Sequence, residues 1–150
     1  MSDSVIVPFV RVPGSEDLDP PVLATSGSAA FDLRSAADGV VAIAPHEIRL
    51  IPTGLRMAIP AGFEGLVRMR SGLSRDGLML ANGVGTIDSD YRGEIGVIVL
   101  NAGDRTRLIG RGQRIAQLAI RPVPAVRLQE VDSLDETERG SGGFGSTGSD

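Results

Sequence analysis

The sequence contains no cysteine, no lysine and no tryptophan, and it has one tyrosine and one histidine. Without cysteine the chain cannot form a disulfide, attack through a thiol or hold a Cys-ligated zinc ion, which suits a reducing compartment. Aromatic residues make up 3% of the chain, so its core must come from Val, Ile, Leu and Ala. The fifteen basic residues are all arginine, whose planar guanidinium group matches phosphate oxygens.

Long apolar runs are also missing. No basic segment followed by a long apolar stretch opens the chain, and no run approaches membrane-spanning length. We therefore expect a cytoplasmic protein with no membrane partner. The net charge of -4 argues against a nucleic-acid backbone as partner, because such binders are normally basic. It does not exclude a nucleotide pocket lined locally by arginine.

Several well-known catalytic motifs are absent. The chain has no Gly-x-x-x-x-Gly-Lys-Ser/Thr loop, no Cys-x-x-Cys, no His-Glu-x-x-His and no Gly-x-Ser-x-Gly elbow. The lone His46 follows a proline in an expected turn, which is typical of a solvated side chain rather than a metal ligand. Any chemistry must rest on carboxylates, arginines and backbone groups, with or without a metal brought in by the substrate.

The 150 residues suit one domain, and 20 glycines with 9 prolines indicate many turns between short strands. The pattern predicts an all-β, jelly-roll-like antiparallel β-barrel with one short helix and a flexible Gly-rich tail. We expect an edge strand at 5–12 and a helix at 74–80, opened by a Ser-Gly step that serves either as an ordinary cap or as an anion site. Further strands are expected at 29–35, 40–44, 47–60, 62–70, 94–101, 106–109, 112–120 and 126–131.

The composition changes near residue 132. Residues 1–131 read as the barrel domain, whereas residues 132–150 are polar and then rich in Gly and Ser. A tail of that composition is typically mobile. It also carries Arg139 and Phe144, which leaves two interpretations: a plain disordered end, or a lid that orders on a phosphate ligand.

The stretch 83–96 is the most distinctive part of the chain. Four glycines surround Asp88, Asp90 and Tyr91, and an apolar run follows. Glycine lets a backbone bend sharply and approach a ligand closely, so this pattern favours a hairpin whose open peptide groups face something small and flat. The alternative is a surface hairpin with solvated acids. Asp32 has the same two interpretations, as an exposed strand acid or a functional one.

Five segments, taken in order, resemble the signature motifs of the trimeric dUTPases: 29–34, 70–72, 83–93, 112–118 and 139–148. The third and fifth are quite specific, and the others would be weak alone. The first departs from the usual family pattern, with Ala30 where Gly is common and Phe31 where Tyr is common. We expect little functional consequence from either.

The resemblance implies hydrolysis of dUTP to dUMP and diphosphate, which limits uracil incorporation into DNA and supplies dUMP for dTTP synthesis. Asp88 would be the general base that activates a water for attack on the α-phosphorus. Magnesium would bridge the three phosphates, with Asp32 holding a metal-bound water. Phosphoryl-type transfer needs mainly positioning and charge stabilisation, which such a site can supply.

The resemblance also implies a role for each binding residue. Arg70, Ser71, Gly72 and Gln113 would lie at the phosphates, the first three from a neighbouring subunit. The uracil edge would be read by the backbone of Asn82, Gly85, Thr86, Ile87 and Gly96. Tyr91 would lie against the deoxyribose and leave no room for a 2′-hydroxyl. In the tail, Phe144 would stack on uracil while Arg139, Gly145, Ser146 and Thr147 close over the phosphates.

The family forms homotrimers with shared active sites, and the same is expected here. Two other functions are compatible with the fold. One is a dCTP deaminase, which the Thr-Ile-Asp-x-x-Tyr pattern at 86–91 disfavours. The other is a catalytically silent nucleotide-binding trimer, which the presence of Asp88, Arg139 and Phe144 disfavours.

Overall fold

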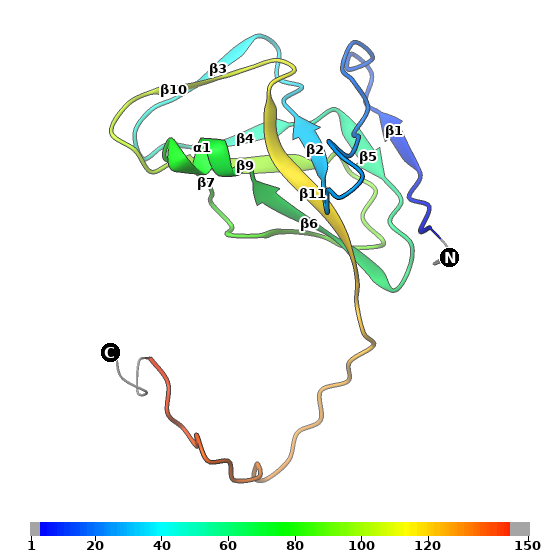
Figure 1. The fold of residues 1–150 in the computed structure, drawn as a ribbon, viewed down its shortest axis with the longest axis vertical. Coiled ribbons are helices and arrows are strands. Elements are labelled where there is room, and N and C mark those ends of the chain that lie inside the picture. The colour runs from blue at the N-terminus through cyan, green and yellow to red at the C-terminus, as the bar shows by residue number, and fades with distance from the viewer. Residues whose placement is uncertain (1–3, 145–150) are drawn as a thin grey trace.

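A computed structural model describes residues 4–144, and these form a mostly β structure with one short helix (Figure 1). The elements are β1 (Phe9–Arg11), β2 (Phe31–Arg34), β3 (Val40–Ile43), β4 (Ile48–Pro52), β5 (Leu55–Met57), β6 (Phe63–Met69), α1 (Ser71–Arg75), β7 (Leu78–Leu80), β8 (Gly85–Ile87), β9 (Gly96–Asn101), β10 (Arg107–Gly110) and β11 (Arg114–Pro122). Within the described range no helix is long and apolar enough to cross a membrane.

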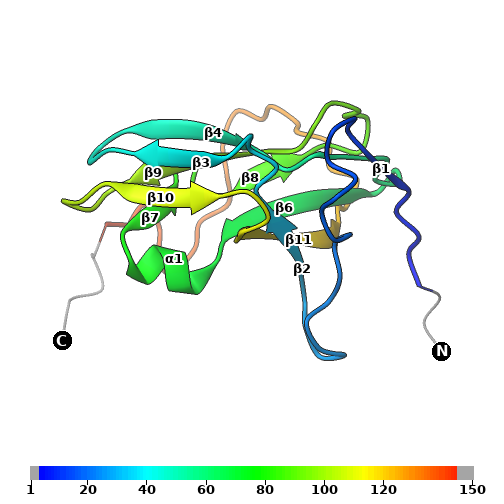
Figure 2. The same cartoon turned by 90° about the horizontal axis from the view of Figure 1, so that it is seen from above.

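The strands pair antiparallel in four small sheets. Their orders are β2-β11-β6-β8, β4-β9-β7, β1-β5 and β10-β3. The antiparallel β prediction is therefore confirmed, but no closed barrel is found among residues 4–144. Figure 2 shows β4 and β9 lying over β6 and β11. One apolar cluster joins these layers, with Leu33, Val67 and Leu118 from one sheet and Ile51 and Val97 from the other.

The helix prediction is wrong in position. α1 spans Ser71–Arg75, and the predicted helical residues Leu78 to Leu80 form strand β7 instead. The helix ends because Gly77 has a φ of 90°, a left-handed conformation that glycine adopts easily. Leu78 and Leu80 are then buried while Met79 is exposed, which is the alternation of a strand.

Two strand predictions also need correction. The expected strand at 47–60 is two strands, β4 and β5, because Gly54 turns the chain with a φ of 69°. The expected strand at 126–131 is not formed, and its side chains are exposed. Figure 1 shows the chain leaving the sheets after β11. A segment with β-strand composition lacks a pairing partner here, and alternation alone cannot supply one.

The loop between β1 and β2 is held by arginine. Arg111, in the β10–β11 turn, donates from Nε to Asp17 Oδ2 at 2.9 Å and from Nη2 to Asp17 Oδ1 at 2.6 Å. It also donates to the Ala36 carbonyl at 2.8 Å and the Gly14 carbonyl at 2.6 Å. These hydrogen bonds to Arg111 hold the pKa of the Asp17 carboxyl below its ordinary value.

We predict that replacing Asp17 by Asn lowers thermal stability at neutral pH and that this deficit disappears in acid. A carboxyl whose pKa is lowered on folding contributes stability above its unfolded pKa, near 4, and loses it as pH falls through the folded pKa. Melting temperatures of both proteins between pH 7 and 3 provide the check. Asp104→Asn is the control, because Asp104 is exposed and forms no salt bridge among residues 4–144. A deficit for Asp17→Asn that persisted undiminished at pH 3 would contradict the assignment.

Candidate active site

A cavity of about 300 Å³ opens where β8 and β9 separate, and we call it the hairpin cavity. The expected hairpin is not a paired one: β8 is an edge strand of the four-stranded sheet, and β9 is the central strand of the three-stranded sheet. An edge strand leaves part of its N–H and C=O groups without a ladder partner. Those groups are available to a ligand that sits between the two strands.

The structure brings seven predicted residues together at this cavity: Asn82, Gly85, Thr86, Ile87, Asp88, Tyr91 and Gly96. Sequence reasoning missed Leu50, Val67, Leu80 and Glu94, which also line it. Leu50, Val67 and Leu80 come from other strands, so no local pattern in 83–96 signals them. Glu94 lies within that stretch, but nothing in the local pattern marks it as a cavity residue. The Asp88 side chain is exposed at the edge of the cavity, and its backbone carbonyl accepts the N–H of Tyr91 at 3.1 Å.

Two glycines of the cavity wall lie close to a neighbouring side chain. A Cβ on Gly96 would lie 2.6 Å from Leu50 Cδ1, and a Cβ on Gly85 would lie 3.1 Å from Val67 Cβ. A side chain at Gly85 would press on the stiff Cβ of Val67, whereas one at Gly96 would displace the movable end of Leu50. This closeness explains two of the glycines that make the stretch distinctive.

A second cavity, which we call the arginine cavity, has a volume of about 500 Å³. It is lined by Arg34, Arg70, Ser71, Gly72, Leu73, Gly112, Gln113, Arg114 and Gln117. All four predicted phosphate-side residues of the barrel domain are in this set. Its three guanidinium groups give it a positive lining, which favours an anionic ligand.

Asp32 holds the arginines of this cavity. Its Oδ1 lies 3.3 Å from Arg70 Nε and its Oδ2 lies 3.1 Å from Arg114 Nη1, and only 11% of the Asp32 side chain is exposed. Gln117 Nε2 also donates to Oδ1 at 3.4 Å. Of the two interpretations of Asp32, an exposed strand acid is therefore excluded.

The two glutamines that line the arginine cavity, Gln113 and Gln117, have different hydrogen-bond partners. Gln113 accepts the Gly110 N–H at 3.0 Å through its amide oxygen, so part of its side chain is used in the β10–β11 turn. Gln117 lies opposite Asp32 in the β2–β11 ladder and lines the same cavity. Sequence reasoning missed Gln117, although a polar residue between the buried Ala116 and Leu118 was a visible signal.

The predicted tail residues up to position 144 do not line either cavity. Arg139 donates from Nε to the Gly142 carbonyl at 2.9 Å, and Phe144 is fully exposed. Gly145, Ser146 and Thr147 lie outside the described residues. His46 is an exposed turn residue with a φ of 63°, as its place beside proline predicted.

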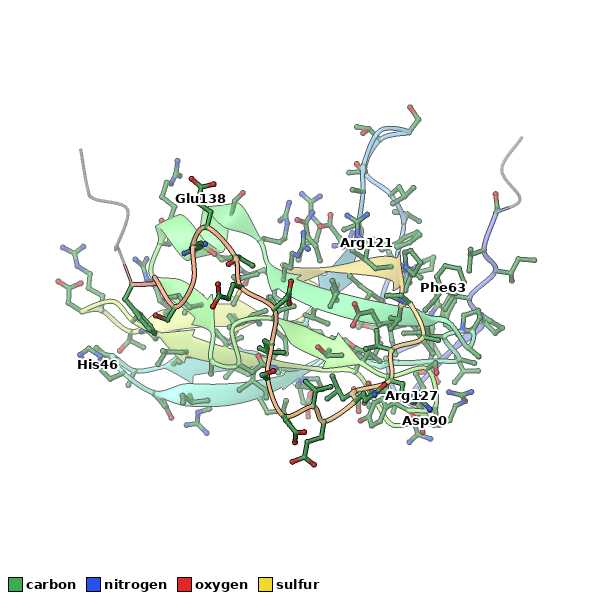
Figure 3. All side chains as sticks on the ribbon, turned by 90° about the horizontal axis from the view of Figure 1, so that it is seen from below. His46, Phe63, Asp90, Arg121, Arg127 and Glu138 are labelled. Atoms are coloured by element: carbon green, nitrogen blue, oxygen red, sulfur yellow. The ribbon has the colours of Figure 1, made fainter. Side chains whose placement is uncertain are left out.

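The chain after β11 first passes the Asp88 turn. An open groove is lined by Phe63, Glu64, Asp88, Asp90 and the 123–125 segment. Figure 3 shows Phe63, Asp90 and Arg127 at one end of the molecule, with His46 at the other. The tail therefore starts beside the β8–β9 connection that carries Asp88.

The hairpin cavity and the arginine cavity share no lining residue. Asp88 and Tyr91 belong to the first, and Arg70 and Gln113 belong to the second. Within residues 4–144 no group of three or more His, Cys, Asp or Glu side chains is placed to hold a metal ion. A divalent cation here would be one carried by a polyphosphate ligand, with protein contact limited to single carboxylates.

Comparison with known proteins shows which family this chain resembles over most of its length. The family model described as dUTPase matches residues 17–148. A deoxyuridine 5′-triphosphate nucleotidohydrolase of Roseobacter denitrificans is 54% identical over 132 residues, which cover 87% of each chain. One of Rhizobium etli is 49% identical over 143 residues, covering 93% of this chain and 92% of that protein.

Solved structures give the same result. A Staphylococcus bacteriophage 80alpha dUTPase mutant with dUpNHpp has a TM-score of 0.82 at 26% identity, covering 96% of this chain and 99% of that chain. A mutant dUTPase from phage phi11 of S. aureus, described for its coordination of a structural Mg(II) ion, has a TM-score of 0.76 at 25% identity. It covers 87% of this chain and 99% of that chain.

We predict that Gly96→Ala destabilises the protein by about 0.5–1.5 kcal/mol, because the new methyl group pushes the exposed Leu50 side chain out of its rotamer. The same change in a Leu50→Ala background should cost little, since the overlapping atom is gone. Urea unfolding at one fixed protein concentration measures both differences. Gly27→Ala is the control, because a Cβ at Gly27 meets nothing within 4 Å. An equal cost in both backgrounds would show that Leu50 does not form this wall.

Proposed function

This chain belongs to the dUTPase family and is a dUTP diphosphatase, and we propose how its two cavities divide the substrate. The hairpin cavity binds the deoxyuridine moiety, and the arginine cavity of a neighbouring copy binds the phosphates. The observation that carries the proposal is the gathering of Asp88, Tyr91 and the edge of β8 around one small cavity. The products are dUMP and diphosphate. In the cell this reaction would limit uracil incorporation into DNA and supply dUMP for dTTP synthesis.

Asp88 is the general base of the proposed reaction. Its exposed carboxylate lies at the edge of the hairpin cavity, where it can accept a proton from a water that attacks the α-phosphorus. The bond to the diphosphate leaving group then breaks. The protein contributes mainly position and charge, because the chemistry of such transfers requires little else.

Uracil is selected by the backbone of β8 and its flanks. The unpaired N–H and C=O groups of an edge strand can match the donor and acceptor pattern of the uracil edge. Cytosine presents the opposite pattern, which would leave buried polar groups unpaired and is therefore strongly rejected. The methyl group of thymine would collide with the close-packed backbone of the 83–96 stretch.

The phosphates are held by arginine and accompanied by magnesium. Arg70, Ser71, Gly72 and Gln113 would contact them in the arginine cavity. Magnesium, when carried by the phosphate oxygens, would supply positive charge opposite the charge that develops during the reaction. The phosphates would supply most ligands of such an ion. Both oxygens of Asp32 lie against Arg70 and Arg114 in this structure, so Asp32 would hold a metal-bound water only after one of these contacts opens.

Sites shared within a homotrimer explain why the two cavities are separate in one chain. A neighbouring copy would bring its arginine cavity to the hairpin cavity. The outer face of the β4-β9-β7 sheet supports such association. Ile48, Leu50 and Met79 are 56%, 67% and 51% exposed on it, which is unusual for a sheet face that stays in water.

The C-terminal tail would act as a lid. It would bring Phe144 onto uracil and Arg139, with Gly145, Ser146 and Thr147, over the phosphates. In the described structure Arg139 and Phe144 are exposed and contact neither cavity, as expected for a segment that orders on its ligand.

Release of diphosphate from dUTP, dCTP, dTTP and UTP in the presence of magnesium tests the proposal. We expect rapid release from dUTP and at most slow release from the other three. Ammonia release from dCTP would indicate a deaminase. Nucleotide binding without release of any product would indicate a silent trimer.

We predict that Asp88→Asn lowers kcat by about 10²–10⁴-fold, because the amide cannot accept the proton of the attacking water. Nucleotide binding should remain largely intact, and it can be followed through the fluorescence of the single tyrosine. Asp90→Asn is the matched control, since Asp90 lies in the same turn but does not line the hairpin cavity. Near-normal turnover by Asp88→Asn would remove Asp88 as the base.

We also predict that ending the chain after Asp135 severely reduces turnover and leaves the melting temperature almost unchanged. The side chains from 121 to 141 are exposed, so removing residues after 135 takes little from the core. Steady-state assays and thermal unfolding of the shortened and full chains measure the two effects. A fully active shortened enzyme would show that the tail is not a lid.

A further inference from the structure

The position of the Tyr91 ring depends on one carbonyl group. Tyr91 is 44% exposed on the wall of the hairpin cavity, and its hydroxyl donates to the Glu94 carbonyl at 2.9 Å. Exposed tyrosines usually sample several rotamers, and one hydrogen bond is a modest restraint. The restraint is effective only if the carbonyl itself is fixed.

Gly93 lets the ring lie close to the backbone. The three atoms nearest to a Cβ built on Gly93 are all atoms of the Tyr91 ring or its hydroxyl, with Cε2 at 2.9 Å. Residues 91–94 therefore form a small closed loop, bounded by the ring on one side and by the Glu94 peptide on the other. Any side chain at position 93 would push the ring away from this loop.

The Glu94 end of the loop is fixed by the segment between β4 and β5. The Glu94 carboxylate accepts the Gly54 N–H through Oε1 at 2.8 Å. The neighbouring Ile95 donates its N–H to the Leu55 carbonyl at 2.8 Å and accepts the Thr53 hydroxyl at 2.6 Å. Thr53, Gly54 and Leu55 thus hold the side chain of Glu94, the peptide group that carries the Glu94 carbonyl, and the peptide group after it.

Gly54, the anchor of the carboxylate, is itself held tightly. Its φ is 69°, and a Cβ there would lie 2.6 Å from Ser15 Oγ. Its carbonyl accepts the Val12 N–H at 2.8 Å and the Ser15 hydroxyl at 3.0 Å. The Gly54 N–H is consequently a fixed point against which the Glu94 side chain can orient the hairpin.

We propose that Glu94 is a positioning residue: its carboxylate, anchored on Gly54, orients its own carbonyl and thereby holds Tyr91 where it excludes a ribose 2′-hydroxyl. The inference rests on the proposed function, in which Tyr91 lies against the deoxyribose and leaves no room for a 2′-hydroxyl. It gives Glu94 a role in substrate selection, although Glu94 takes no part in the bond-breaking step. Selection against UTP then depends on a contact between two segments forty residues apart.

The single tyrosine allows a direct test that does not require turnover. In protein labelled with ¹³C-tyrosine, one set of ring signals reports Tyr91 alone. We expect Glu94→Ala to shift and sharpen these signals as the ring gains mobility, and Glu94→Gln, which keeps an acceptor for Gly54, to leave them near those of the wild type. Unchanged signals in Glu94→Ala would overturn the proposal, whatever the protein's activity.

The second measurement is the ratio of kcat/KM for dUTP to that for UTP. We expect Glu94→Ala to lower this ratio about tenfold, with Glu94→Gln within about threefold of the wild type, since one anchoring hydrogen bond is lost or kept. Gly93→Ala should lower it too, by displacing the ring directly. In a Tyr91→Ala background, Glu94→Ala should cause no further fall.

Glu47→Ala is the control, because Glu47 accepts the Ala44 N–H at 2.8 Å in a turn outside both cavities. A purely structural role for Glu94 would reduce dUTP and UTP turnover equally and leave the ratio unchanged, which would overturn the proposal. A further fall in the Tyr91→Ala background would do so as well. A wild-type protein that releases no diphosphate from dUTP would instead contradict the proposed function, and the ring signals would still decide the role of Glu94.

Discussion

The separation of β8 and β9 is the constraint on which the site depends. The two strands are consecutive in the chain, yet β8 pairs at the edge of one sheet while β9 pairs on both sides in another. The connection at 88–95 must therefore span a gap rather than close a tight turn. The hairpin cavity lies in that gap. It stays open because β8 is hydrogen-bonded to β6 while β9 is hydrogen-bonded to β4 and β7.

The second constraint is electrostatic: several arginine side chains must lie close together in the arginine cavity. Arg70 and Arg114 approach the same wall, and Asp32 lies between them with little exposure to water. A carboxylate in this position offsets part of the repulsion and keeps the guanidinium groups directed. An overall acidic chain can thus present a positive cavity, because the sign of a local site is independent of net charge.

Local patterns in the sequence predicted much of this arrangement. Strands with clear alternation, such as β6 and β9, lie close to where they were expected, and the glycines of 83–96 correctly indicated close backbone approach. The errors arose where tertiary pairing overrides local preference. Leu78 to Leu80 became a strand because β9 offers it a partner, and residues 126–131 lack one.

Some residues of the candidate site could likewise be selected from the sequence, whereas others are defined only by the fold. Residues within one motif, such as Asp88 and Tyr91, could be selected from sequence because the motif is contiguous. Glu94 lies within the same stretch, but its role depends on Gly54, and nothing local links the two. Leu50 and Gln117 likewise act through strand neighbours that only the fold defines.

The central proposal is that a neighbouring chain completes each site. It is supported by Asp88 and Arg70 lining two cavities that share no residue within one chain. Mixing two inactive variants, Asp88→Asn and Arg70→Ala, after joint unfolding and refolding tests it most directly. If copies assemble at random and each site pairs the hairpin of one with the arginines of the next, about one quarter of the sites regain both groups. Recovery of dUTP hydrolysis to about that fraction of the wild-type rate is the result we predict. A mixture as inactive as its separate components would contradict the shared site.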